Sequence, residues 1–229
     1  KTAKARSKIK AFIREEQVKN LFMGYTARTE CIWGLHAPKM YLDIRSRLYP
    51  TRLTETFNMV RDNYQTIFRV SSFTSVNNDY RYQAYFTRTK WEHSVVTLTK
   101  LYDKNYDEEQ TVPSGRTPGI NLVRLPELFY ILAESVYDRD PAAALDYLNR
   151  VVTARGLLPL EAGDIDTPGK FRDELINEIT KEYWGEGQIF FTNKRFWLAM
   201  EGVNGKRHAA SDETYVLPLP ESENSEGIN

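Results

Sequence analysis

Residues 177–197, NEITKEYWGEGQIFFTNKRFW, combine regularly spaced glutamates with a high density of aromatic side chains. Glu178, Glu182 and Glu186 recur at intervals of four, so in a continuous helix they would share one face. Two carboxyl groups placed one turn apart could act as general acid and general base on a glycoside. The aromatic rings could instead hold a sugar, or the stretch could be purely structural. The spacing alone leaves these three hypotheses open.

The residues around the glutamates favour the structural hypothesis. Lys181 and Arg195 lie close enough in sequence to neutralise the glutamates, and no second acidic cluster accompanies them at a recognisable cleft. The aromatic residues alternate with the expected inward-facing positions of the helices, which is typical of a core. They are Tyr183, Trp184, Phe190, Phe191, Phe196 and Trp197. We therefore interpret the stretch as a seam between helices and predict no catalytic residue.

Composition excludes several other classes of site. The 229 residues contain 31 Lys and Arg and 31 Asp and Glu, so no net charge attracts nucleic acid or an anionic membrane. Cys31 is the only cysteine, and no two of the 3 histidines have the spacing of a metal-binding helix. We predict no metal site, no cofactor and no nucleic-acid partner. The sequence also lacks the apolar run of about 18 residues that predicts a transmembrane helix.

The first half of the sequence mixes one helical pattern with long irregular stretches. Residues 1–23 have helical spacing and no signal-peptide pattern, so we expect the chain to be the later part of a longer protein. Residues 25–50 read as a loop with scattered aromatic residues. Alternation over residues 79–86 and the β-branched run at 94–102 predict a small β-hairpin, and 102–119 reads as a surface loop.

The second half has the clearest helical signals. Apolar residues at three- and four-residue spacing predict helices over 122–137 and 141–155, the second capped by Asp140 and started by Pro141. Their combined length, about 34 residues, and the alanines at their crossing are typical of one tetratricopeptide-like unit. The predicted fold is therefore mostly α, with tetratricopeptide-like helix pairs, long irregular loops and a small β-hairpin.

Two further helices and an extended tail are expected after this pair. Thr167 and Pro168 start a helix whose apolar residues follow at four-residue spacing, and Gly185 ends it. The inward-facing residues of this helix are Phe171, Leu175, Ile179 and Tyr183. A shorter apolar helix follows Gly187. The prolines of the tail, residues 213–229, predict an extended chain there.

Three blocks of the second half resemble successive C-terminal signatures of the SusD/RagB family. They are INLVRLPELFYILAESVYDRDPAAALDYLNRVVTARGL, ELINEITKEYWGEGQIFFTNKRF and TYVLPLPESE, and they follow one another at the family's separations. The residues that match the family's structural motif are Glu134, Glu182, Glu186, Gly187 and Arg195. The chain departs from the pattern at Ile179, where the family usually has an arginine, and it lacks the arginine and aspartate that usually follow Glu-Gly.

The resemblance implies a surface lipoprotein of Bacteroidetes that binds a glycan for polysaccharide utilisation and does not cleave it. The implied partners are an oligosaccharide and a SusC-like TonB-dependent transporter. The implied location is the outer-membrane surface, reached through an N-terminal lipid anchor absent from this chain. In this scheme residues 1–120 form the middle region and the ligand side, and residues 121–229 form the C-terminal helical region with its extended tail.

Sugars are usually held by aromatic faces on loops of a rigid scaffold. Our candidate ligand-binding residues are the aromatic residues not tied to a helix face, namely Trp33, Tyr41, Tyr49, Tyr80 and Trp91. Two alternatives to glycan binding stay open. A tetratricopeptide-like protein-interaction scaffold would bind peptides, and a glycoside hydrolase, the less favoured alternative, would turn over a sugar substrate.

Overall fold

The computed structural model describes residues 30–36, 58–70, 78–88, 95–98, 119–201 and 206–218. The chain divides into two compact units, Lys1–Gly185 and Glu186–Asn229. Most of the regular structure in the described residues is helical, and the predicted mostly α fold is confirmed. The helix expected over residues 1–23 lies outside the described residues.

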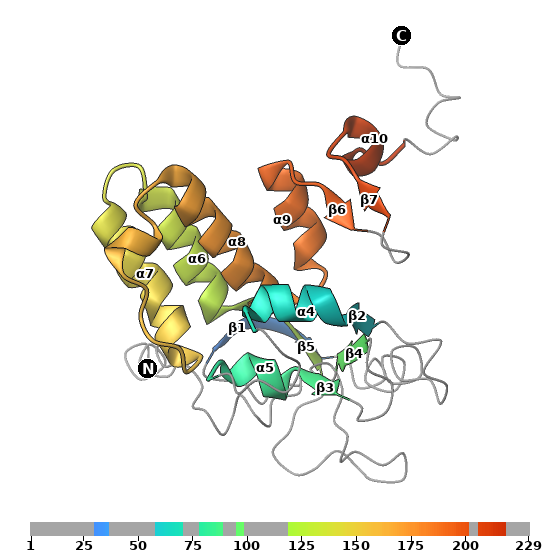
Figure 1. The fold of residues 1–229 in the computed structure, drawn as a ribbon, viewed down its shortest axis with the longest axis horizontal. Helices are drawn as coiled ribbons and strands as arrows, with labels where there is room; N and C mark the ends of the chain where they lie inside the picture. The colour runs from blue at the N-terminus through green and yellow to red at the C-terminus, as the bar shows by residue number, and fades with distance from the viewer. Residues whose placement is uncertain are drawn as a thin grey trace. The chain divides into compact units, whose positions relative to one another are not determined.

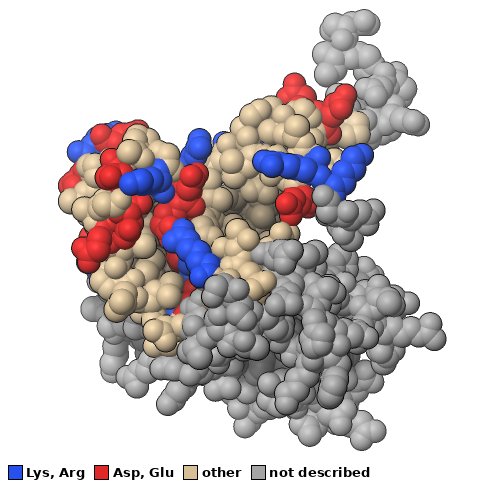
Figure 2. All heavy atoms as spheres, in the orientation of Figure 1, with Lys and Arg blue, Asp and Glu red and all other residues tan. Residues whose placement is uncertain are grey.

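Three helices form the main body of the first unit (Figure 1). They are α6 (Leu125–Val136), α7 (Pro141–Ala154) and α8 (Pro168–Tyr183), with the short 3-10 helix η3 (Ala162–Asp164) between the last two. A turn of four residues joins α6 to α7, so the two run antiparallel as a helical hairpin. On the face drawn in Figure 2, acidic and basic side chains are interspersed over this body, as the balanced composition predicts.

The starts of α7 and α8 follow the expected capping chemistry. The Asp140 side chain accepts a hydrogen bond from the Ala143 amide at 2.9 Å, and Pro141 occupies the first turn of α7. The Thr167 hydroxyl accepts from the Lys170 amide at 3.2 Å before Pro168. Each side chain satisfies a backbone N–H that the first helical turn leaves without an intrahelical partner. Both predicted helix starts are confirmed.

Small residues let α6 and α7 pack closely, and an aromatic stack joins α8 to them. Ala133 and Ala144 are both fully buried. The Tyr137 ring lies parallel to the Phe171 ring, with 3.9 Å between the ring centroids. Such stacked and buried side chains contribute about 1.5 to 3 kcal/mol each to folding. All four inward-facing residues predicted for α8 are buried. They are Phe171, Leu175, Ile179 and Tyr183.

A second core in the first unit consists mainly of aromatic residues. It is formed by α4 (Arg61–Phe68), α5 (Tyr80–Ala84) and a three-stranded sheet of β2 (Asn58–Val60), β4 (Val95–Leu98) and β3 (Phe86–Arg88), in that order. Its buried side chains are Tyr64, Phe68, Tyr82, Tyr85, Phe86 and Leu98. The antiparallel pairing of β3 with β4 confirms the small predicted hairpin.

The sequence prediction was wrong for residues 80–84, which are helical and not a strand. The Asp79 carboxylate accepts from the Arg81 amide at 3.0 Å and so caps a helical turn. This turn brings Tyr82 and Tyr85 into the same aromatic core. In a strand these two residues would point to opposite faces. Burial of both rings therefore outweighs the local alternating pattern.

One strand of the first unit lies where a loop was expected. Strand β1 (Cys31–His36) pairs antiparallel with β5 (Gly119–Arg124), so the prediction of loop throughout 25–50 was wrong. Leu122 belongs to β5, and α6 begins at Leu125 rather than at residue 122. This pairing joins segments on both sides of residue 120 within the first compact unit.

The second unit contains α9 (Gln188–Phe196), a short hairpin of β6 (Met200–Glu201) and β7 (Arg207–His208), and α10 (Asp212–Tyr215). The tail prediction was wrong at residues 213–215, because the Ser211 side chain accepts from the Thr214 amide and caps α10. Tyr215 is buried. The centroid of its ring lies 5.6 Å from that of Phe190 and 5.7 Å from that of Trp197.

Two aromatic residues expected in the core are exposed. Phe191 is 65% exposed and Trp197 is 53% exposed. Trp197 follows the last residue of α9 and has a left-handed backbone, with φ at 55°. This turn ends the helix, so Trp197 leaves the helical spacing on which the core prediction rested. Trp184, Phe190 and Phe196 are half-buried, and Tyr183 is buried.

We predict that Ala133→Leu lowers the free energy of unfolding by about 1 to 3 kcal/mol, because the added carbons overpack the crossing of α6 and α7. Ala142→Leu is the control, since residue 142 is exposed on the same hairpin. The measurement is chemical unfolding of both variants. An Ala133→Leu variant as stable as the control would contradict the close crossing.

We predict that Gly156→Ala destabilises the protein more than Gly187→Ala does. Both glycines have positive φ, at 85° and 79°, so alanine costs about 1 kcal/mol of backbone strain at each position. A methyl group at position 156 would also lie 2.7 Å from the Asn78 carbonyl oxygen and closer still to the Tyr80 ring, whereas position 187 has open space. Equal melting midpoints for the two variants would exclude this clash.

Candidate functional site

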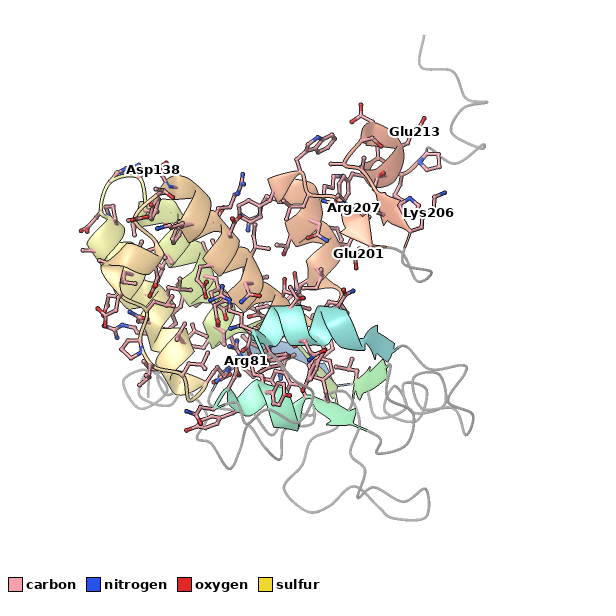
Figure 3. The ribbon with its side chains drawn as sticks, in the orientation of Figure 1. Arg81, Asp138, Glu201, Lys206, Arg207 and Glu213 are labelled. Carbon is pink, nitrogen blue, oxygen red and sulfur yellow. The ribbon has the colours of Figure 1, made fainter. Side chains whose placement is uncertain are left out.

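Charged side chains fill the centre of the first unit, where an apolar core would be expected. Four carboxylates and four cations there are each at most 5% exposed. We call these residues the buried charge cluster, which consists of Glu30, Asp79, Glu178, Glu182, Arg81, Arg124, Arg155 and Lys181. Arg81, labelled in Figure 3, lies among the side chains between α5 and the larger helices. The formal charges of the cluster sum to zero.

Glu182, near the end of α8, accepts hydrogen bonds from three arginines on three different segments. Arg124 of β5 donates to one carboxylate oxygen at 2.7 Å, and Arg81 of α5 donates to the other at 3.3 Å. Arg155, directly after α7, donates to both oxygens at 2.9 and 3.0 Å. The Tyr85 hydroxyl also lies 3.5 Å from this carboxylate. Glu182 therefore joins four separate parts of the fold.

Glu30, the residue before β1, forms the second link of the cluster. Both of its carboxylate oxygens accept from Arg155, each at 3.0 Å, in a bidentate pair. Its backbone carbonyl accepts from the Leu125 amide at 2.8 Å. Arg124 approaches the same carboxylate at 3.8 Å. The side chain and the main chain of Glu30 thus both hold the start of β1.

Asp79 and Glu178 complete the cluster around Arg81. The Arg81 guanidinium donates to Asp79 at 2.9 and 2.8 Å and to Glu178 at 2.9 Å. Lys181 pairs with Glu178 one turn earlier on α8, and its ammonium lies 3.7 Å from Asp79. These contacts join α5 to α8.

The cations of the cluster keep the carboxyl groups of Glu178 and Glu182 ionised. Burial alone would raise the pKa of Glu182, but Arg155, Arg124 and Arg81 hold it well below its usual range. Burial acts in the same direction on Glu178, and Arg81 with Lys181 lowers its pKa below the ordinary value. Removing one partner from such a pair leaves an uncompensated buried charge, which costs about 3 to 5 kcal/mol. Loss of any one partner should therefore destabilise the fold strongly.

These surroundings do not suit acid and base chemistry at the two glutamates. Glu178 and Glu182 do lie one turn apart on α8, as the spacing predicts. A general acid needs a raised pKa, whereas both carboxyls here are held ionised by cations. Both side chains are also at most 1% exposed, so a substrate has no access to them. The arrangement supports a structural role for this part of the aromatic and glutamate-rich stretch.

The residues that match the family motif lie in both compact units. Glu182 belongs to the buried charge cluster, and Glu134 is half-buried on α6. In the second unit, half-buried Glu186 is followed by Gly187, which precedes α9 with a left-handed backbone. The Arg195 guanidinium lies 4.3 Å from the centroid of the Phe196 ring. Glu134, Glu186 and Arg195 each make further interactions.

The candidate ligand-binding aromatic residues differ in their exposure. Trp33 is 59% exposed on β1, beside exposed Ile32 and Leu35. Tyr80, at the start of α5, is half-buried against the aromatic core. Tyr41, Tyr49 and Trp91 lie outside the described residues. Trp33 is thus the candidate whose ring is presented to solvent in the described part of the chain.

The sequence did not identify the arginines that neutralise Glu182. Lys181 does pair with Glu178, as expected, but Glu182 is neutralised by Arg81, Arg124 and Arg155. These arginines lie 101, 58 and 27 residues away from it in sequence. An isolated arginine carries no local signal of burial, because helix and strand patterns report only neighbouring residues. Sequence reasoning therefore could not have found this cluster.

Two other kinds of site are absent from the described segments. Within them, no group of three or more His, Cys, Asp or Glu side chains is arranged to hold a metal ion. Nor does any helix in these segments combine the length and apolar character needed to cross a bilayer.

We predict that the melting midpoint falls at both ends of the pH range. The pKa values of Glu178 and Glu182 are lowered on folding, so their contribution is present above the unfolded value of about 4.3 and is lost as pH falls through the folded values. Burial, aided by Glu182 and Glu178 respectively, raises the pKa values of Tyr85 and Tyr130, so stability also decreases as pH rises above about 10.

Thermal melts from pH 3 to pH 11 test this prediction. Glu182→Gln, though less stable throughout, should show a weaker dependence on acid pH, and Tyr85→Phe a weaker dependence on alkaline pH. A midpoint that stayed constant between pH 7 and pH 3 would contradict the assigned protonation states.

Several solved structures are similar to the chain over nearly its whole length. A SusD-like carbohydrate binding protein from Bacteroides vulgatus ATCC 8482 matches with a TM-score of 0.66 and 18% identity, covering 98% of this chain and 52% of that chain. A SusD superfamily protein from Bacteroides thetaiotaomicron VPI-5482 matches with a TM-score of 0.68 and 20% identity, covering 97% and 52%. At such identities the likeness shows the fold.

The chain spans about half the length of these solved structures. The search of curated proteins finds no match. The sequence model of the SusD family, however, matches residues 39–226, which is most of the chain. The resemblance seen in the three sequence blocks is thereby confirmed, and the chain belongs to the SusD family.

Proposed function

We propose that this protein binds an oligosaccharide at the outer-membrane surface without cleaving it, and delivers it to a SusC-like TonB-dependent transporter. SusD family membership indicates a carbohydrate-binding role. One of the similar structures is a SusD-like carbohydrate binding protein, which supports the same class of ligand. Delivery, lipid anchoring and surface location belong to the proposal and rest on the family alone.

The observation that carries the proposal is the exposed indole of Trp33. A large aromatic side chain that is 59% exposed leaves much apolar surface in water. Exposed apolar surface often marks a binding site, and Ile32 and Leu35 of the same strand are exposed as well. The flat ring can stack on the apolar C–H face of a pyranose. Trp33 therefore supplies the kind of platform that an oligosaccharide requires.

The backbone that carries Trp33 lies in an irregular part of its strand. Strand β1 pairs with β5, and the register shifts on both sides of Trp33. Such bulges redirect side chains and are frequent beside binding sites. A platform held in place before binding loses less free energy to ordering, which favours affinity. Tyr41, Tyr49, Tyr80 and Trp91 are proposed as further ligand contacts.

Binding without cleavage is consistent with the chemistry of the first unit. The glutamates that could have formed an acid and base pair are buried and neutralised by arginine and lysine. A hydrolase would need an accessible carboxyl group with a raised pKa. The proposal therefore assigns Glu178 and Glu182 to the scaffold and the ligand to exposed aromatic residues.

One observation favours the alternative of a tetratricopeptide-like scaffold that binds peptides. Leu128, Ile131 and Leu132 are 41%, 55% and 40% exposed and form one stripe along α6. An apolar helix stripe can receive a helical peptide. The stripe does not provide a flat ring for sugar stacking, so it separates the two hypotheses experimentally.

We predict that the intact protein binds a defined oligosaccharide with micromolar to millimolar affinity, about the range expected for one or two stacked rings. Trp33→Ala should weaken this binding about tenfold or more, because it removes the stacking surface. Trp197→Ala is the matched control, since it removes an exposed tryptophan of the second unit. A glycan array would select the ligand, and calorimetry would measure both variants.

Chromatography of the incubated oligosaccharide tests the absence of cleavage. Release of shorter sugars would overturn the non-catalytic proposal. No binding across a broad array, together with peptide binding that is lost in Ile131→Ser, would favour the scaffold alternative.

A further inference from the structure

We propose that the Glu30–Arg155 ion pair is a positioning device for the Trp33 platform, so that the buried charge cluster sets the orientation of the ligand-binding strand. This inference rests on the proposed function. It assigns Glu30 and Arg155 a role in ligand affinity although neither side chain is accessible to a ligand.

Glu30, the residue before β1, holds the start of this strand through its side chain and through its main chain. Its carboxylate accepts two parallel hydrogen bonds from Arg155, both at 3.0 Å. Its backbone carbonyl accepts from Leu125, the first residue of α6, at 2.8 Å. Trp33 follows three residues later. A rotation of the chain at Glu30 would therefore move the exposed indole directly.

Arg155 cannot move to follow such a rotation. Its guanidinium is fully buried and also donates to Glu182 at 2.9 and 3.0 Å. The planar fork of arginine matches a carboxylate in few orientations, so two carboxylates on one guanidinium restrict it strongly. The position of Glu30 is thus set by α8 through Arg155, and not by β1 itself.

The pairing of β1 with β5 does not fix the platform alone. Cys31 lies opposite Arg124 and Trp33 opposite Val123, and the register shifts between these pairs. It shifts again between Trp33 and Gly34. Two irregularities in a six-residue strand interrupt the ladder on both sides of Trp33. Trp33 is 59% exposed, so packing restricts its ring less than it restricts a core residue.

Glu178 offers a matched comparison within the same cluster. Its side chain is as buried as that of Glu30 and pairs with Arg81 and Lys181. These contacts join α8 to α5 and do not involve the start of β1. Loss of either glutamate charge destabilises the cluster, whereas only loss of the Glu30 charge releases the strand that carries Trp33.

The experiment is a double-mutant cycle on the intact protein. Glu30→Gln and Glu178→Gln are made alone and combined with Trp33→Ala, and both are expected to lower the melting midpoint. The unaltered protein is first tested by calorimetry with hexasaccharides of α-glucan, β-glucan, xylan and mannan. The hexasaccharide that binds is then used to measure every variant. Glu30→Gln should raise the Kd for this hexasaccharide about threefold or more, because the platform is no longer held in place. Glu178→Gln should leave this Kd unchanged.

The decisive measurement is the effect of Glu30→Gln when Trp33 is already alanine. If Glu30 acts through Trp33, the change in Kd disappears in that background. An equal weakening by Glu30→Gln and Glu178→Gln, or an effect that persists without Trp33, would overturn the inference and leave the proposed function intact. Failure of the unaltered protein to bind any oligosaccharide would instead overturn the proposed function, and the inference with it.

Arg155→Lys keeps the test valid if Glu30→Gln does not fold. It retains the positive charge but loses the bidentate fork that orients Glu30. Its Kd should rise in the same direction, again only when Trp33 is present. An unchanged Kd for a folded Arg155→Lys variant would contradict the positioning role.

Discussion

The carboxylate of Glu182 is the point at which the first unit converges. Arginines from α5, from β5 and from the end of α7 all donate to it, and Arg155 extends the connection to Glu30 before β1. A buried charge without its partners is strongly unfavourable, so these segments can be buried only together. Strands and helices that are distant in sequence are thereby held in one arrangement by a single small set of directional contacts.

Apolar packing and the buried charge cluster contribute in different ways. The stripe of α8, from Phe171 to Tyr183, buries apolar surface and supplies much of the driving force for folding. That force is non-directional, so it does not by itself distinguish one register of α8 from another. The hydrogen bonds to Glu182 do distinguish them, since a shift of α8 by one residue would turn this carboxylate away from its three arginines.

The division of roles between core and surface is consistent with a binding protein. Titratable groups gather inside the first unit, where they are paired and neutral as a set, while the Trp33 ring lies at the surface. The departure from the SusD pattern at residue 179 fits the same scheme. Ile179 belongs to the buried apolar stripe of α8, and the four carboxylates of the cluster are matched by four cations without a further arginine.

Local signals in the sequence are sufficient to predict the helical body and the family of this protein. Asp140 with Pro141, and Thr167 with Pro168, encode helix starts within one turn, and the apolar spacing of α6 to α8 is equally local. Tertiary structure decided the rest. Residues 80–84 are helical because two tyrosines share one core, and residues 31–36 form a strand because β5 pairs with them. The partners of Glu182 and Glu30 were also decided there. They lie up to 125 residues away, and contacts over such separations leave no periodic pattern in the sequence.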